Sequence, residues 1–244
     1  MSRRTRRRLA VVGTVAALGI GSPFWGPAVM RTVPAFRVAG IDVMGARFVH
    51  ADAARALAAI LPEASVWDDH SNAVVRLETH PLIEEARIRR QGFSRLMIEL
   101  REVHPVALVS APVLEPVDGK GTILPLDPSA HAVDLPILLH ATVEAGRVAD
   151  EDSRRVLAVL ERLDSLSPGF VQRVSEIRRS SGDAIELLLL AGSHVESIIL
   201  PIDGAEVAFL RAEDAIGECV DRGRVVSVDA RFRDQIVVEL EEAA

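Results

Sequence analysis

Seven histidines invite a chemical interpretation of this 244-residue chain, because imidazole both binds metals and transfers protons. None of them forms the H-E-x-x-H pair that places two imidazoles on one face of a helix. Two of them, His50 and His80, fall at the ends of expected helices, where neutral polar residues are common. We therefore expect surface or helix-end positions, rather than metal ligands, for the whole set: His50, His70, His80, His104, His131, His140 and His194.

Two carboxylates and a glycine-containing run are the next candidates for chemistry. Glu99 and Glu102 are three positions apart on an expected strand, so they point to opposite faces and cannot form a catalytic pair. The run Asp118-Gly119-Lys120-Gly121 resembles a phosphate-binding loop only faintly. It lacks the G-x-x-x-x-G-K-[ST] frame and a helix N-terminus. A hairpin turn is the structure expected there.

The single cysteine, Cys219, excludes an intrachain disulfide and a cysteine-based zinc site. It shares one face of an expected short helix with Ile216 and Val220, which is typical of a core residue rather than a nucleophile. Neither G-x-S-x-G nor S-x-x-K occurs in the chain, so the motifs of serine hydrolases are missing. The sequence therefore predicts no catalytic residue, no cofactor and no metal, and it argues against an enzyme.

Composition and charge narrow the remaining classes of protein. With 49% hydrophobic and 26% charged residues, the chain is neither disordered nor collagen-like. Five of its 28 basic residues and none of its 35 acidic ones lie in residues 1–30, so the rest carries a net charge of −12. A body this acidic repels a phosphate backbone, and no basic-aromatic patch is evident. Nucleic acid is not an expected partner.

The elements that position any functional residue begin with an uncharged segment, residues 9–30. As a helix, these 22 residues would measure about 33 Å, against about 30 Å of bilayer hydrocarbon. Five arginines precede the segment, and the positive-inside rule keeps them in the cytoplasm. The sequence thus predicts a cytoplasmic basic tail (1–8), a transmembrane helix (9–30) and an exported body.

A cleaved signal peptide is the alternative interpretation of the same segment. Pro23 and Pro27 interrupt its second half, and Gly19-Ile20-Gly21 is a passable small-x-small cleavage site. Phe24 and Trp25 are typical of an interfacial aromatic anchor, which favours retention in the membrane. In both interpretations, the chain after residue 30 is exported from the cytoplasm.

The first part of the body predicts one small unit. A strand is expected over 37–45, an alanine-rich helix over 50–61, and a second helix from Asp68 or Asp69 through Leu77. Strands are expected over 82–90 and 96–103, with residues 103–108 closing the unit. The order is β-α-α-β-β.

The second part predicts a β-rich unit with helices packed on its sheet, an α+β arrangement. A helix is expected over 151–163, because its apolar residues share one face. The expected hairpin pairs 174–179 with 184–190 through a turn at 180–183. A strand at 194–200, a short helix at 211–222 and a long strand at 225–240 follow.

Three motifs stand out in the first unit. Residues 38–45 match the pattern V-x-x-I-x-V-x-G. Residues 81–88 resemble P-x-V-x-x-A-x-V, with Ile83 in place of valine. Residues 98–107 resemble I-x-V-x-E-R-x-P-V-A, with Val103 in place of arginine. In this order the motifs resemble the FtsQ-type POTRA domain of the bacterial cell division family FtsQ/DivIB. The resemblance implies a POTRA domain over 36–108 and the family's β-rich domain over 109–244.

The resemblance continues downstream, so it covers essentially the whole chain. Residues 134–138 resemble the family's D-L-P-x-L link, and 227–232 its terminal I-D-L-R-F strand. The family implies a non-enzymatic, single-pass scaffold at the division septum. Its implied partners are FtsB/DivIC-like and FtsL-like single-span division proteins and, through them, the septal peptidoglycan synthase complex. The tail of eight residues is short for this family, which weakens any cytoplasmic docking role. A periplasmic hydrolase or an envelope-stress receptor is the alternative function.

The last strand carries the expected binding site. From Val226 to Leu240 apolar and polar residues alternate in phase, so one long strand is favoured over a hairpin. A terminal strand is often a sheet edge, which can accept a partner strand by β-augmentation; a shielded closing strand is the plainer alternative. The family resemblance places partner pairing in this segment. The expected partner-binding residues are Phe232, Arg233, Asp234, Gln235, Ile236, Val237 and Val238.

Overall fold

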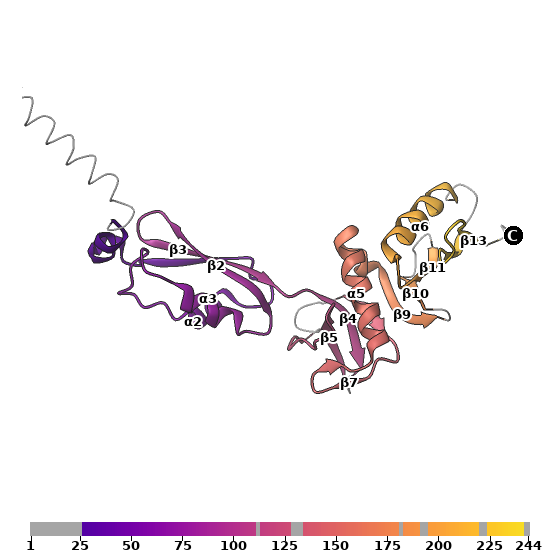
Figure 1. Ribbon diagram of the computed structural model, residues 1–244, viewed down its shortest axis with the longest axis horizontal. Helices are drawn as coiled ribbons and strands as arrows, with labels where there is room; N and C mark the ends of the chain where they lie inside the picture. Colours follow the sequence, from indigo (N-terminus) through magenta and orange to yellow (C-terminus); the bar gives the residue numbers. More distant parts are fainter. Residues whose placement is uncertain are drawn as a thin grey trace, which may run out of the picture. The chain divides into compact units, whose positions relative to one another are not determined.

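The computed structural model describes residues 26–110, 113–127, 134–180, 183–190, 195–219 and 224–241 (Figure 1). The chain divides into two compact units, one ending at Glu102 and the other beginning at Val103. Residues 26–32 are helical. Most of the predicted transmembrane segment lies outside the described residues, and none of the helices described is both long enough and apolar enough to cross a bilayer.

The first unit is a three-stranded sheet with two helices on it. The sheet order is β1-β3-β2, with β1 parallel and β2 antiparallel to the central β3. The two helices touch each other and pack on β1 and β2 through buried apolar residues such as Ala54, Ala73 and Leu77. The predicted β-α-α-β-β order is confirmed. The elements are η1 (Pro34–Phe36), β1 (Gly40–Met44), α2 (Ala51–Ala58), α3 (Ser71–Glu78), β2 (Ile83–Gln91) and β3 (Arg95–Glu102).

The second unit is built on an eight-stranded mixed sheet, whose order is β13-β12-β11-β10-β9-β6-β4-β5. Helix α5 packs on β4, helix α6 packs on β11 and β12, and the two helices contact each other. The elements are β4 (Pro105–Ser110), β5 (Leu114–Asp118), β6 (Ile137–Leu138), β7 (Val143–Glu144), β8 (Arg147–Val148), α5 (Glu151–Leu166), η2 (Val171–Arg173), β9 (Val174–Ser180), β10 (Ala184–Leu189), β11 (Val195–Pro201), α6 (Ala205–Cys219), β12 (Val225–Asp229) and β13 (Val237–Leu240).

Helix α5 anchors the core of this unit. Its N-cap, Asp150, accepts a hydrogen bond from the amide of Ser153 at 2.8 Å, which satisfies a donor of the first turn. Its apolar face buries five residues completely against the sheet. Phe170 then packs edge-to-face on Phe209 of α6, with ring centroids 4.5 Å apart. The buried residues of the α5 face are Val156, Leu157, Val159, Leu160 and Leu163.

Three sequence predictions differ from this fold. Residues 103–108 do not close the first unit: β4 pairs with β5 and β6 in the second sheet, because its side chains are buried there on both faces. Helix α6 begins at Ala205, six positions before its expected start, because Ala205, Ala208 and Phe209 extend its buried face. The predicted long strand at 225–240 is instead two strands, β12 and β13, paired antiparallel.

Other predictions agree with the structure or concern residues that the structure does not describe. The antiparallel pairing of β9 and β10 is confirmed, but turn residues 181–182 lie outside the described residues. The same holds for the predicted turn at 191–193 and for the end of the α6 helix at 220–222.

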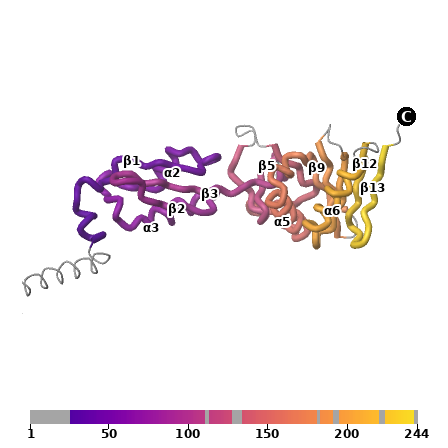
Figure 2. Tube along the Cα trace, turned by 90° about the horizontal axis from the view of Figure 1, so that it is seen from above, coloured from indigo at the N-terminus to yellow at the C-terminus, as the bar shows by residue number. Residues whose placement is uncertain are grey.

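The two outermost strands of the large sheet differ. On the outer side of β5, the amide of Leu124 donates to the carbonyl of Pro116 at 2.8 Å, and Val117 bridges Ile123. On the outer side of β13, no described strand is paired. In Figure 2, β13 lies at the end of the unit, in yellow.

Candidate partner-binding edge

The β13 edge is the candidate binding surface of the second unit. Among the strands that the structure describes, β13 pairs only with β12, in the register Val228↔Val238 and Asp229↔Val237. Its inner partner is itself tied to β11 by parallel pairing. The edge therefore has a rigid sheet behind it and, among the residues described, no neighbour in front.

One hydrogen bond fixes which amides of β13 face outward. The amide of Glu241 donates to the carbonyl of Arg224 at 2.9 Å, so Glu241 faces β12. Between the pairs Val225↔Leu240 and Ser227↔Glu239, β12 advances two residues and β13 only one, so the bulge belongs to β12. Because successive amides in a regular strand point to opposite edges, Val237 faces inward and Val238 faces outward.

The seven predicted site residues form the approach to this strand and its start. Arg233, Asp234 and Gln235 are exposed, and Phe232 is 44% exposed. Val237 is 50% exposed, and it begins β13. Ile236 and Val238 instead pack against the hydrophobic core. The segment thus offers polar and apolar side chains outward while two residues hold it to the sheet.

Two contacts hold the segment in place. The guanidinium of Arg231 lies 2.6 Å from the carboxylate of Asp229, and the hydrogen bond lowers the pKa of that carboxyl. Ala230, between them, is buried, which ends β12 against the core. From α6, Arg211 donates to the carbonyl of Phe232 at 3.2 Å. The bend after β12 is therefore fixed by side chains on both sides.

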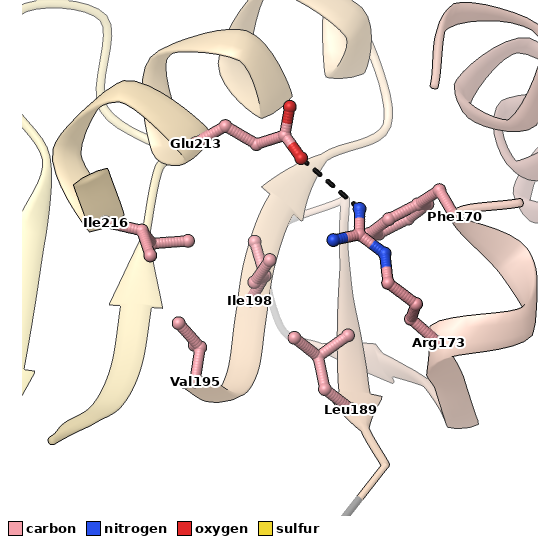
Figure 3. Close-up of a pocket in the computed structure, with 7 residues that line it drawn as sticks. All are labelled: Phe170, Arg173, Leu189, Val195, Ile198, Glu213 and Ile216. Carbon is pink, nitrogen blue, oxygen red and sulfur yellow. Dashed lines mark hydrogen bonds and ion pairs between the residues drawn. The ribbon is translucent and has the colours of Figure 1, made fainter. Parts of the chain in front are cut away.

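A separate pocket of about 310 Å³ lies between the sheet and α6 (Figure 3). Five of its lining residues are apolar, and the other two are joined by a hydrogen bond from Arg173 of η2 to Glu213 of α6 at 3.3 Å. Arg173 also lies over the Phe170 ring. The arrangement suits an apolar group; no reacting group stands in it. The lining residues are Phe170, Arg173, Leu189, Val195, Ile198, Glu213 and Ile216.

The sequence of this chain is similar to known proteins of one family. The model of the family "Cell division protein FtsQ/DivIB, C-terminal" matches residues 107–242. A protein of Myxococcus fulvus named cell division protein FtsQ is 28% identical over 240 residues, which cover 93% of this chain and 82% of the relative. Another of that name, from Syntrophotalea carbinolica, is 25% identical over 162 residues, covering 64% of this chain and 57% of the relative.

The chain belongs to the FtsQ/DivIB family. The family match begins at Ala107, inside β4, which agrees with β4 being part of the second sheet. It includes the whole β12–β13 edge. The resemblance that the sequence motifs indicated is confirmed.

The other residues that the sequence singled out have structural partners in this FtsQ/DivIB chain. Glu102 is buried and accepts hydrogen bonds from the amides of Phe48 and Val49 at 2.7 and 2.9 Å. Glu99 pairs with Arg89 at 3.2 Å. The predicted turn at residues 118–121 is confirmed by the hydrogen bond from Gly121 to the carbonyl of Asp118.

Two of the histidines and the cysteine also have local structural roles. His50 is the N-cap residue of α2, and His80 follows α3 and accepts from the amide of Leu82 at 3.2 Å. Cys219 packs partly buried beside Ile216. His131 and His194 lie outside the described residues. Sequence reasoning missed the apolar pocket, because its lining residues come from separate elements and share no motif.

Proposed function

We propose that this chain is a non-enzymatic, membrane-anchored scaffold of the cell division machinery. It binds FtsB/DivIC-like and FtsL-like single-span division proteins outside the cytoplasmic membrane, and through them helps recruit and regulate the septal peptidoglycan synthase complex. Its first unit is an FtsQ-type POTRA domain, and residues 9–30 are its single membrane span. Membership of the FtsQ/DivIB family and the names of its relatives support a role in cell division.

The observation that carries the proposal is the outer side of β13, along which no strand of the described residues is paired. A partner strand laid along it gains main-chain hydrogen bonds from outward-facing groups such as those of Val238. The exposed side chains of Arg233, Gln235 and Val237 then distinguish one partner strand from another. A rigid sheet behind the edge means that little ordering entropy is lost by the scaffold on binding.

A pair of proline substitutions tests strand addition. Val238→Pro removes an outward amide donor, so the domain should stay folded while capture of the FtsB/DivIC-like partner is lost. Val237→Pro removes a donor that faces β12, so it should break the β12–β13 ladder and lower the stability of the domain. Partner binding is measured by co-purification of the full chains, and folding by circular dichroism and amide exchange.

The matched controls separate backbone from side-chain effects. Val238→Ala keeps the amide and should retain most of the binding. Arg233→Ala with Gln235→Ala keeps the backbone and should weaken affinity without abolishing it. Folded Val238→Pro protein that captures its partner as well as the unchanged chain would place the binding site elsewhere.

Localisation tests the cellular role independently. A fluorescently tagged full chain should form a band at midcell in dividing cells, and its membrane fraction should resist alkaline extraction. An even signal around the envelope would contradict the division role. Release of a mature chain that begins near Ser22 would contradict anchoring and support a cleaved signal peptide.

A further inference from the structure

Three aromatic rings form a strip beside the N-terminal segment of the first unit. Phe93 occupies the turn that joins β2 and β3 and is 78% exposed, the largest exposed fraction among the large hydrophobic residues described. Its ring is 6.3 Å from that of Phe36, and Phe36 is 6.1 Å from the ring of Trp67. Three rings from η1, the α2–α3 connection and a hairpin tip thus form one continuous strip.

Arginines surround the strip, although the exported body as a whole is acidic. Arg90 lies over the Trp67 ring at 3.7 Å, and Arg37 is exposed beside Phe36. Among the residues described, no carboxylate pairs with either of them. Arg31 donates to the carbonyl of Trp67 at 3.0 Å and lies 3.7 Å from Asp68. We call these six residues the hairpin-tip face: Arg31, Phe36, Arg37, Trp67, Arg90 and Phe93.

The hairpin-tip face lies close in sequence to the proposed membrane span. Phe36 follows Met30, the last residue of that segment, by six positions, which limits their separation to about 20 Å even in a fully extended chain. The intervening chain is more compact, because residues 26–32 are helical and Pro34–Phe36 is a 3₁₀ turn. Figure 1 shows this indigo segment beside the end of the β2–β3 hairpin.

We infer that the hairpin-tip face rests on the anionic headgroup layer of the membrane that holds the chain's own anchor. The indole of tryptophan has an apolar ring and a polar N–H, so it favours the bilayer interface, and arginine pairs with lipid phosphates. Phe93 inserts at the acyl boundary while Arg37 and Arg90 bind phosphate groups. This inference rests on the membrane anchor of the proposed function, but not on the β13 edge.

The native tryptophans allow a direct test in the full chain. The chain has two, Trp25 and Trp67, so Trp25→Phe leaves Trp67 as the only fluorophore of its kind. This protein is reconstituted into vesicles of phosphatidylglycerol and phosphatidylcholine, with or without bromine near the headgroup end of the acyl chains. We expect bromolipids to quench Trp67 and its emission to shift to the blue. In vesicles of phosphatidylcholine alone, the quenching should fall.

Variants identify the residues responsible. Phe93→Ser, and Arg37→Ser with Arg90→Ser, should each reduce the quenching of Trp67. Met44→Ser is the matched control, because Met44 is 58% exposed and lies on β1 of the same sheet. Met44 pairs with Glu99, four residues beyond Arg95, where β3 begins, so it lies away from the hairpin tip. It should leave quenching unchanged. Circular dichroism checks that each variant is folded.

The outcomes distinguish this inference from the anchor. Protein that resists alkaline extraction but shows no quenching of Trp67 overturns the inference and leaves the anchor intact. Quenching that is unaffected by Phe93→Ser, or that is equal in neutral and anionic vesicles, also overturns it. Protein that washes off at alkaline pH refutes the anchor and overturns the inference with it, even if Trp67 is quenched beforehand.

Discussion

Asp150 shows how one side chain links a helix end to pH. Partial burial raises the pKa of this carboxyl, but hydrogen bonds from Ser153 and Thr142 outweigh the burial and hold the pKa at about 2. An unfolded aspartate titrates near 3.9. The stabilisation is therefore fully present above about pH 4 and is lost as the pH falls toward 2.

The Asp150→Asn variant isolates that contribution, because asparagine also caps helices but carries no charge. We expect it to lower the free energy of unfolding at pH 7 by about 1–2 kcal/mol. The difference from the unchanged protein should shrink as the pH approaches 2. Urea unfolding followed by circular dichroism at several pH values measures it. A difference that does not depend on pH would contradict this explanation.

Glu102 gives a second prediction at the residue scale. Its buried carboxylate accepts from two amides that precede α2, so Glu102→Leu should remove both hydrogen bonds and cost about 1–3 kcal/mol for each. Glu99→Leu is the control on the same strand: its pair with Arg89 is partly exposed and worth about 1 kcal/mol or less. Thermal unfolding of both variants measures the contrast. Equal losses would refute the role of burial.

At the scale of elements, the sequence predicts best the longer helices and strands that bury a single face. The helix now described as α5 keeps its apolar residues in one stripe, and the β2–β3 hairpin lies between clear turn residues. The sequence predicts one strand where the structure has the β12–β13 hairpin, because apolar and polar residues keep alternating in phase through the loop between the two strands. Alternation reports which face is buried, and it does not report where a chain reverses.

The reversal after β12 depends on contacts that only folding creates. Arg231→Ala should leave Asp229 without its main partner and loosen the bend, raising the amide exchange of β13 by about tenfold relative to α5. Arg178→Ala, which removes an exposed pair with Glu176 on β9, serves as the control and should have a smaller effect. Hydrogen exchange measured by mass spectrometry compares them. Unchanged exchange in β13 would show that the bend does not need Arg231.

For the candidate site, the sequence predicted the segment and its edge position but not its geometry. The edge position of β13 is confirmed, and partner binding by Phe232 to Val238 stays a prediction. The β12 bulge decides which amides face outward, and it has no glycine or proline to indicate it. The same limit applies to the hairpin-tip face, whose three rings come from separate parts of the chain: Phe36 from η1, Trp67 from the α2–α3 connection and Phe93 from the turn at residues 92–94.

At the scale of the whole molecule, the boundary between the units is a testable feature. A fragment of residues 26–102 should fold, because β1, β2 and β3 complete their sheet without β4. In a fragment of residues 26–108, the added residues should remain unstructured, since their pairing partners are β5 and β6. Nuclear magnetic resonance shifts of residues 103–108 distinguish the two. Strand-like shifts there would return this segment to the first unit.

The unequal edges of the large sheet also limit how copies of the chain associate. Chains that expose two complementary edges can join head to tail without end, which is the route to fibres. Here the chain's own residues 122–124 cover part of the outer side of β5, whereas no strand of the described residues lies outside β13. Two copies meeting through β13 would be related by a twofold axis, and each would use up the other's free edge. Self-association of this domain through its sheet therefore closes at a pair.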